Sequence, residues 1–194
     1  MKLFSAFFIA LIFVGSCKPK STTAFVDPLT VDTPGNYFPV ARFVEGQIVE
    51  ITKLPINPML IKTQGGKKDT SFLNMETTKQ VMHPFYGLGI DTANLHKEIK
   101  ETKFLDQTLN MFTFLYEPRN KEMPAGFKPI HWEVYVNAEN GNVERISIFE
   151  KAENENTFRQ MVFQPFIGNA SIVNLKRSAD SLVVVDESKI LWRY

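Results

Sequence analysis

Apolar residues recur at three- and four-residue spacing soon after a polar stretch near the start of the chain. Side chains three and four positions apart lie on one face of a helix, so the pattern predicts an amphipathic helix over residues 39–53. Pro39 suits the first turn of that helix, where a missing N–H costs nothing, and Pro55 follows its end. The apolar positions are Val40, Phe43, Val44, Ile48 and Ile51.

A hairpin and a second helix are expected next. Residues 58–63 and 69–73 flank the Gly-Gly-Lys-Lys sequence of residues 65–68, which predicts two short strands joined by a glycine turn. Asn74 can then cap a helix over residues 74–83, because an asparagine side chain accepts a hydrogen bond from a free N–H of the first turn.

The pattern then changes from helical to strand-like. Residues 84–89, which begin with a proline, are expected to break the second helix, and a short helical piece is expected over residues 92–99. From residue 104 onward the chain predicts strands, with a tight turn at Asn140-Gly141. Short links between successive strands imply antiparallel pairing. The candidate strands are residues 109–116, 130–137, 143–151, 158–166, 170–176, 182–185 and 189–193.

These elements predict an α+β fold in which an antiparallel β-meander sheet packs against two or three N-terminal helices. Several strands carry apolar residues on both faces. Under strict alternation, for example, Phe158 and Val162 lie opposite Met161 and Phe163. We expect helices to cover one face and a curled sheet edge or a docked N-terminal segment to cover the other. The alternative is an apolar cavity for a lipid or another hydrophobic ligand.

The first residues have the three parts of a secretory signal peptide. Lys2 supplies the positive charge, residues 4–14 form an apolar run, and two small residues precede Cys17. A helix that crosses a bilayer takes about 20 apolar residues, so a transmembrane anchor is the weaker interpretation of this short run. We therefore expect a signal peptide over residues 1–16, a tether over residues 17–36 and a single α+β domain over residues 37–194.

Charge and cysteine content narrow the possible functions. The chain has 22 Lys plus Arg against 21 Asp plus Glu, a net charge of +1, so nothing in its charge favours nucleic acid as a partner. Cys17 is the single cysteine of the chain, so a structural disulfide within one chain is excluded. One interpretation of the single cysteine is a secreted protein in which Cys17 has no special role.

No combination of residues predicts a metal, cofactor or nucleotide site. The three histidines, His83, His96 and His131, show no metal-binding spacing, and each is expected to be a surface or capping residue. The glycine pair within residues 87–89 lacks the preceding strand and the lysine of a phosphate-binding loop. No serine lies in the Gly-x-Ser-x-Gly motif that positions a nucleophile.

Two carboxylates are the remaining candidates for catalysis. Glu133 and Glu144 lie on neighbouring predicted strands, and a pair of carboxyl groups about 5–9 Å apart can hydrolyse a glycosidic bond. Alternating acidic residues usually mark the solvated face of a sheet, however, and Arg145 is expected as a cross-strand partner of Glu133. We therefore expect no catalytic residue and a protein that is not an enzyme.

The segment Val14-Gly15-Ser16-Cys17 looks like the lipobox of bacterial lipoproteins. With the helix opening at residues 37–40 and the hairpin of residues 134–149, it makes the mature chain resemble small lipoproteins of Gram-negative bacteria. The resemblance implies that a diacylglyceryl group alkylates the Cys17 thiol and that cleavage makes Cys17 the new N-terminus. Two or more acyl chains hold a protein firmly at a membrane.

The resemblance leads to an expected function. We expect a non-enzymatic, lipid-anchored protein of the cell envelope, at the outer membrane or facing the periplasm, that binds another envelope component such as a protein. The alternative is a carrier or sensor of a lipid or other hydrophobic ligand in an apolar cavity. Thr92 and Ser181 each lie in an Asp-Ser/Thr-apolar triplet similar to a bacterial O-glycosylation acceptor, so either is a possible glycan site.

Overall fold

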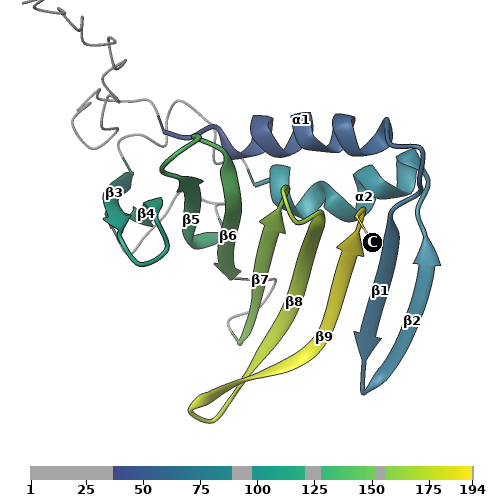
Figure 1. The fold of residues 1–194 in the computed structure, drawn as a ribbon. Helices are drawn as coiled ribbons and strands as arrows, with labels where there is room; N and C mark the ends of the chain where they lie inside the picture. The colour runs from purple at the N-terminus through teal and green to yellow at the C-terminus, as the bar shows by residue number, and fades with distance from the viewer. Residues whose placement is uncertain (1–36, 89–97, 121–127, 152–155, 194) are drawn as a thin grey trace, which may run out of the picture. The chain divides into compact units, whose positions relative to one another are not determined.

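The computed structural model describes residues 37–88, 98–120, 128–151 and 156–193 (Figure 1). The chain divides into two units, Met1–Asp32 and Thr33–Tyr194, and all described residues belong to the second unit. The expected signal peptide, the tether with Cys17, and most of the helical piece predicted over residues 92–99 lie outside the described residues.

Two helices form as the sequence predicts, with one difference at the end of the second. Helix α1 spans Val40–Thr52, in agreement with its apolar stripe. Helix α2 spans Met75–Tyr86, and its Asn74 cap exchanges hydrogen bonds with Thr77. The expected break at residues 84–89 is wrong for the first three residues, because α2 continues through Pro84. That extension buries Phe85 completely, and the burial offsets the hydrogen bond that a proline removes.

Within the described residues, nine strands form one antiparallel sheet in the order β2-β1-β9-β8-β7-β6-β5-β4-β3. The α+β class and the antiparallel sheet are confirmed. Strands β3 to β9 follow one another in chain order, whereas the early β1–β2 hairpin lies beside β9. The strands are β1 Met59–Gln64, β2 Lys67–Phe72, β3 Ile99–Asp106, β4 Met111–Pro118, β5 Pro129–Asn137, β6 Val143–Lys151, β7 Thr157–Gln164, β8 Asn169–Ser178 and β9 Ser181–Leu191.

Strand β3 is absent from the sequence-based prediction. Glu101 and Lys103 interrupt the alternation of apolar and polar residues that would have predicted a strand here. The strand begins at Ile99, where a helical piece was expected to end. The two charged residues share a face and form an ion pair of 2.8 Å. Pairing with β4 satisfies the backbone of this strand on one side, which explains why a weakly patterned segment becomes a strand.

Strand β9 also differs from the prediction. Two short strands over residues 182–185 and 189–193 were expected, but one continuous strand runs from Ser181 to Leu191. The polar residues Asp186 and Ser188 in its middle remain in the strand because they pair with β8 on one side and with β1 on the other. Tertiary pairing therefore overrides a locally polar sequence.

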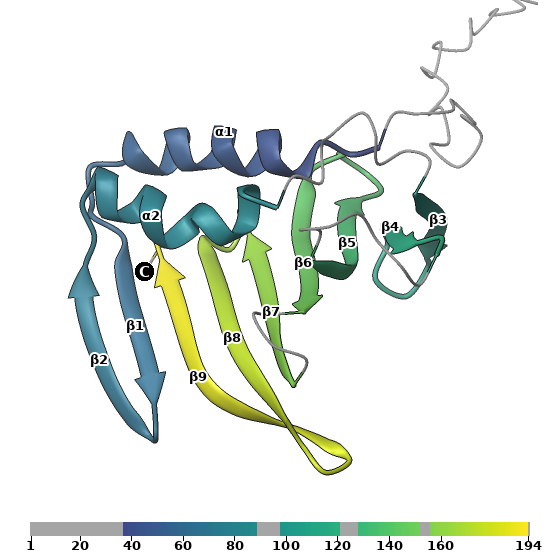
Figure 2. The same ribbon diagram turned by 180° about the vertical axis from the view of Figure 1, so that it is seen from behind.

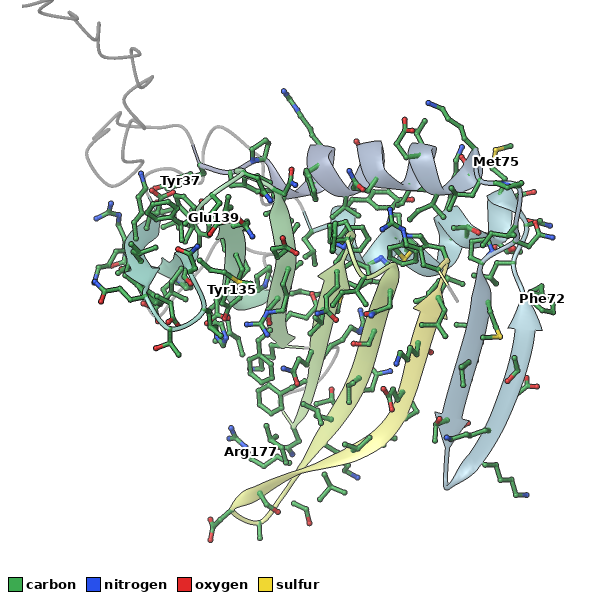
Figure 3. The ribbon with its side chains drawn as sticks, in the orientation of Figure 1. Tyr37, Phe72, Met75, Tyr135, Glu139 and Arg177 are labelled. Carbon is green, nitrogen blue, oxygen red and sulfur yellow. The ribbon has the colours of Figure 1, made fainter. Side chains whose placement is uncertain are left out.

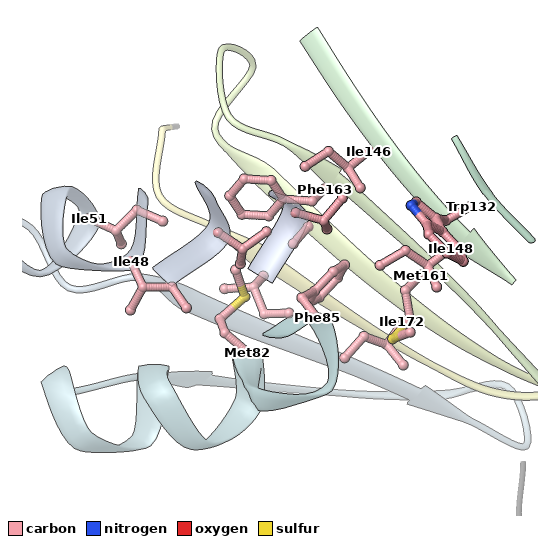
Figure 4. Packing of buried hydrophobic residues seen from close by; sticks show 14 of the residues in the cluster. Ile48, Ile51, Met82, Phe85, Trp132, Ile146, Ile148, Met161, Phe163 and Ile172 are labelled. Carbon is pink, nitrogen blue, oxygen red and sulfur yellow. The ribbon is translucent and has the colours of Figure 1, made fainter. Parts of the chain in front are cut away.

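The core lies between the two helices and one face of the sheet. Figures 1 and 2 show both helices across the ends of the strands where β7 and β9 finish, while the other halves of β7, β8 and β9 extend beyond the helices. In the core, Met82 and Phe85 of α2 meet strand residues such as Ile146 and Phe163 (Figure 4). The Phe85 and Phe163 ring centroids are 5.8 Å apart.

The opposite face of the sheet carries a smaller apolar cluster. Phe158 of β7 is 7% exposed, and its ring stacks on Phe149 of β6 with the centroids 5.6 Å apart. Leu175 of β8 lies opposite Phe158 in the register. Local aromatic packing thus accounts for part of the apolar character of this second face.

Candidate functional site

A row of polar side chains crosses four neighbouring strands of the sheet. Glu150 of β6, Arg159 of β7, Asn174 of β8 and Asp186 of β9 lie opposite one another in the register. Arg159 donates from Nη1 to Glu150 Oε1 at 2.9 Å and from Nε to Asn174 Oδ1 at 3.2 Å. Asn174 in turn donates from Nδ2 to Asp186 Oδ1 at 2.7 Å. Each side chain of the row therefore orients the next.

Glu150 is the unusual member of this row. It shares a strand face with the core residues Ile146 and Ile148, and it is 1% exposed. Its Oε1 atom accepts from Arg159, but its Oε2 atom is buried without a hydrogen-bond partner among the described residues. Burial raises the pKa of the Glu150 carboxyl group, and the nearby charges of Arg159 and Lys128 oppose that effect. The carboxyl is thus a desolvated group with unused hydrogen-bonding capacity.

A pocket of about 210 Å³ opens onto Glu150 between the sheet and the C-terminal turn of α2. Its wall on the α2 side includes Gly87, where a Cβ atom would lie 2.5 Å from the His83 ring, so the glycine leaves room for the histidine to fold back. The pocket combines one buried carboxyl with basic side chains, an arrangement suited to a small polar ligand. Its lining residues are His83, Pro84, Gly87, Leu88, Lys128, Glu150 and Arg159.

A second feature is the hairpin formed by β8 and β9. Strand β1 pairs with β9 only from Asp186 to Leu191, so on the β1 side residues 181–185 have no strand partner among the described residues. Four consecutive apolar residues lie in this segment, exposed by 45%, 49%, 58% and 45% from Leu182 to Val185. Figure 1 shows this part of the hairpin projecting from the sheet, and Arg177 lies on it in Figure 3.

The two histidines that the structure describes, His83 and His131, do not converge. His83 lines the pocket, whereas His131 lies on the opposite sheet face with its ring 5.5 Å from Phe149. His96 lies outside the described residues. Within the described part of the chain, no three His, Cys, Asp or Glu side chains come close enough to hold a metal ion.

The two carboxylates considered for catalysis have separate partners. Glu133 accepts a hydrogen bond from the Tyr135 hydroxyl, and Glu144 accepts from Asn137 at 3.5 Å. The register places Arg145 directly opposite Tyr135, and therefore diagonal to Glu133 across the two strands. Its guanidinium carbon lies 3.9 Å from the Tyr135 ring centroid. A register shift between Tyr135 and Val136, close to the Asn-Gly turn, brings Glu133 opposite Ser147.

The possible modification sites fall in different parts of the chain. Ser181 begins β9 at the tip of the hairpin, and its hydroxyl donates to the Ser178 carbonyl at 3.2 Å. Thr92 and Cys17 lie outside the described residues. Neither described helix is long and apolar enough to span a membrane.

Sequence reasoning missed Glu150, Arg159 and Lys128 as site residues. The alternation of β6 carried a usable signal for Glu150, because Ile146, Ile148 and Glu150 fall on one face and a carboxyl at the end of an apolar row is out of place. No such signal existed for Lys128, which reaches the pocket only through the tertiary fold.

Comparison of the chain with models of protein families, with curated proteins and with solved structures gave no match.

Proposed function

We propose that this chain is a non-enzymatic lipoprotein of the cell envelope, anchored through a lipid on Cys17 at the outer membrane or on the periplasmic side of the envelope. In this proposal it binds another envelope protein through the β8–β9 hairpin. The support for the anchor is the signal-like N-terminus, in which an apolar run and two small residues precede the single cysteine. The scaffold is a meander of strands with α1 and α2 packed on one of its faces.

The run of exposed apolar residues from Leu182 to Val185 is the observation that carries the binding proposal. Consecutive apolar residues on a surface are unfavourable unless they serve an interaction. Here they coincide with a strand edge that β1 leaves unpaired. An extended segment of a partner can add to such an edge through backbone hydrogen bonds, while its side chains contact the apolar residues.

The apolar residues can contribute a useful share of the binding energy. Burial of a whole Val or Leu side chain contributes about 1.5–3 kcal/mol, and these four side chains are each roughly half exposed, so each retains about 1 kcal/mol for an interface. The sum of about 3–6 kcal/mol is less than the roughly 8 kcal/mol of a micromolar complex. Backbone pairing along the edge would have to supply the remainder, which is why an extended partner segment fits better than a helix.

The alternative function, a carrier of a lipid or another hydrophobic ligand, requires an apolar cavity. The pocket below α2 is lined by Glu150, Arg159 and Lys128, whose charges do not suit an acyl chain. The hairpin therefore supports the binding proposal more directly than any described cavity supports the carrier.

The anchor and the hairpin can be tested separately in the native membrane. Cys17→Ser should release the processed chain from membranes washed with high salt, and retention of the variant after proven signal cleavage would refute the anchor. For the hairpin, a photocrosslinking residue at Val184 should give a crosslinked adduct with an envelope protein, and the adduct should weaken when Val183 is replaced by Lys.

The chain offers a matched control for this substitution. Val183 is 49% exposed and Val49 of α1 is 47% exposed, so Val49→Lys introduces the same charge at a site of the same exposure. We expect Val183→Lys to reduce the Val184 adduct at least tenfold and Val49→Lys to leave it unchanged. Equal effects of the two variants, or an adduct that neither changes, would contradict a role for the hairpin.

A further inference from the structure

We propose that the pocket between the C-terminal turn of α2 and the sheet binds a small zwitterion of the amino-acid class. Its ammonium group would contact Glu150 Oε2, and its carboxylate would lie toward Lys128 and Arg159. The pocket and the β8–β9 hairpin use different residues, so this proposal does not depend on the anchor or on a protein partner.

The buried oxygen of Glu150 is the first argument for a ligand. Leaving a buried acceptor without a donor destabilises a fold, and the effect is larger for a charged group. The same strand face carries isoleucines at positions 146 and 148, and an apolar residue at position 150 would avoid that cost. A ligand ammonium group, with three N–H donors, would supply the partner that Oε2 lacks.

The position of Glu150 next to α2 also favours a cation. The pocket wall includes Gly87, which caps the C-terminal end of this helix, and His83 and Pro84 from its last turn. The C-terminus of a helix carries a partial negative charge, which stabilises a positive group placed near it. An ammonium group at Oε2 therefore interacts favourably with the carboxyl group and with the helix end.

Two cationic side chains can bind the carboxylate group of the ligand. Arg159 contacts Oε1 of Glu150, and its side chain is 30% exposed, while Lys128 is exposed and lines the same pocket. Arg159 is held in place by Asn174, which Asp186 holds in turn. A cation with a fixed position binds a carboxylate with less loss of side-chain entropy than a mobile one.

The size of the pocket limits the ligand. Its volume of about 210 Å³ compares with roughly 30 Å³ for one water molecule in the liquid, so it has room for a small amino acid. A lipid or a folded peptide would not fit. Alanine is therefore a suitable probe, because it carries both charged groups on a minimal frame.

The test is isothermal titration calorimetry on the full-length protein in a non-ionic detergent, with three probes of similar size. L-Alanine carries both charges, propionate lacks the ammonium group and ethylamine lacks the carboxylate. We expect alanine to bind and each of the other two to bind at least tenfold more weakly. Propionate that binds as tightly as alanine would overturn the zwitterion in favour of a simple anion, and absence of alanine binding at millimolar concentration would overturn the proposal.

Two pairs of variants locate the site. Glu150→Gln should weaken alanine binding at least tenfold, whereas Glu144→Gln, on the same strand, should leave it unchanged. Lys128→Ala should weaken alanine binding severalfold, whereas Lys151→Ala, at an exposed position beside Glu150, should not. If Glu150→Gln fails to fold, the Lys128→Ala variant provides the test, because Lys128 is exposed. Unchanged affinity of Lys128→Ala for alanine would then overturn the proposed site.

Discussion

Replacement of Glu150 by Gln should change how the stability of the fold depends on pH. Burial raises the pKa of this carboxyl group above its ordinary value of 4.5, against the opposing charges of Arg159 and Lys128. The folded state therefore binds the Glu150 proton more tightly than the unfolded state does. The resulting stabilisation is fully present below the ordinary pKa and is lost as the pH rises through the raised pKa of the folded state.

The magnitude follows from this linkage. Each unit by which the folded-state pKa exceeds the unfolded value corresponds to about 1.4 kcal/mol of stability lost between the acidic and the neutral limit. Glutamine has nearly the same shape and does not titrate. The difference in the free energy of unfolding between the two proteins therefore isolates Glu150.

The assay is urea denaturation of both proteins between pH 4 and 8, each with Cys17→Ser so that no lipid is attached. We expect the free energy of unfolding of the protein with Glu150 to fall relative to that of Glu150→Gln as the pH rises. For one proton, the fall is no more than about 1.4 kcal/mol per pH unit. Glu144→Gln, on the same strand, serves as the control for the replacement of a carboxyl group by an amide. A constant difference would mean that Arg159 and Lys128 balance the effect of burial, and a wild type that gains stability with rising pH would mean that they outweigh it; either result would refute the reasoning.

Three further substitutions test local features. Phe85→Ala should lower the free energy of unfolding by about 3–5 kcal/mol in urea denaturation, because the ring is fully buried; a loss below about 1 kcal/mol would contradict the described core. Asn74→Ala should cost about 1 kcal/mol by removing the cap that Thr77 shares, with a matching loss of helical circular dichroism. Gly168→Ala should cost more than about 1 kcal/mol, because φ is +80° and the new Cβ would meet Arg193 at 2.5 Å; a neutral thermal midpoint would refute this.

The elements that the sequence predicts well depend on local interactions. The stripe of α1 follows from three- and four-residue spacing, and Asn74 caps α2 through an atom only three residues from its partner. Gly65 and Gly66 adopt positive φ angles of 54° and 77°, which places the β1–β2 turn where a glycine pair allows it. Gly141 does the same between β5 and β6. Each of these features is decided within a few residues.

The errors arise where distant parts of the chain decide the outcome. Helix α2 continues through Pro84 because Phe85 has a place in the core, which no local rule can show. Strand β3 forms because β4 lies beside it, and β9 remains continuous through Asp186 because β1 and β8 flank it. In each case, packing or pairing with a remote segment outweighs local propensity.

The sequence by itself determined the α+β class, the positions of most strands and the expectation of a lipid on Cys17, because periodicity, turn residues and a short signal motif are all local patterns. Only the tertiary structure decided that Glu150 and Arg159 meet across two strands and face the end of α2. It also decided that β1 ends before the tip of β9 and leaves Leu182–Val185 with a free edge. Both features depend on register and on strand length relative to a neighbour, and these are set by the contacts of the folded chain rather than by any one segment.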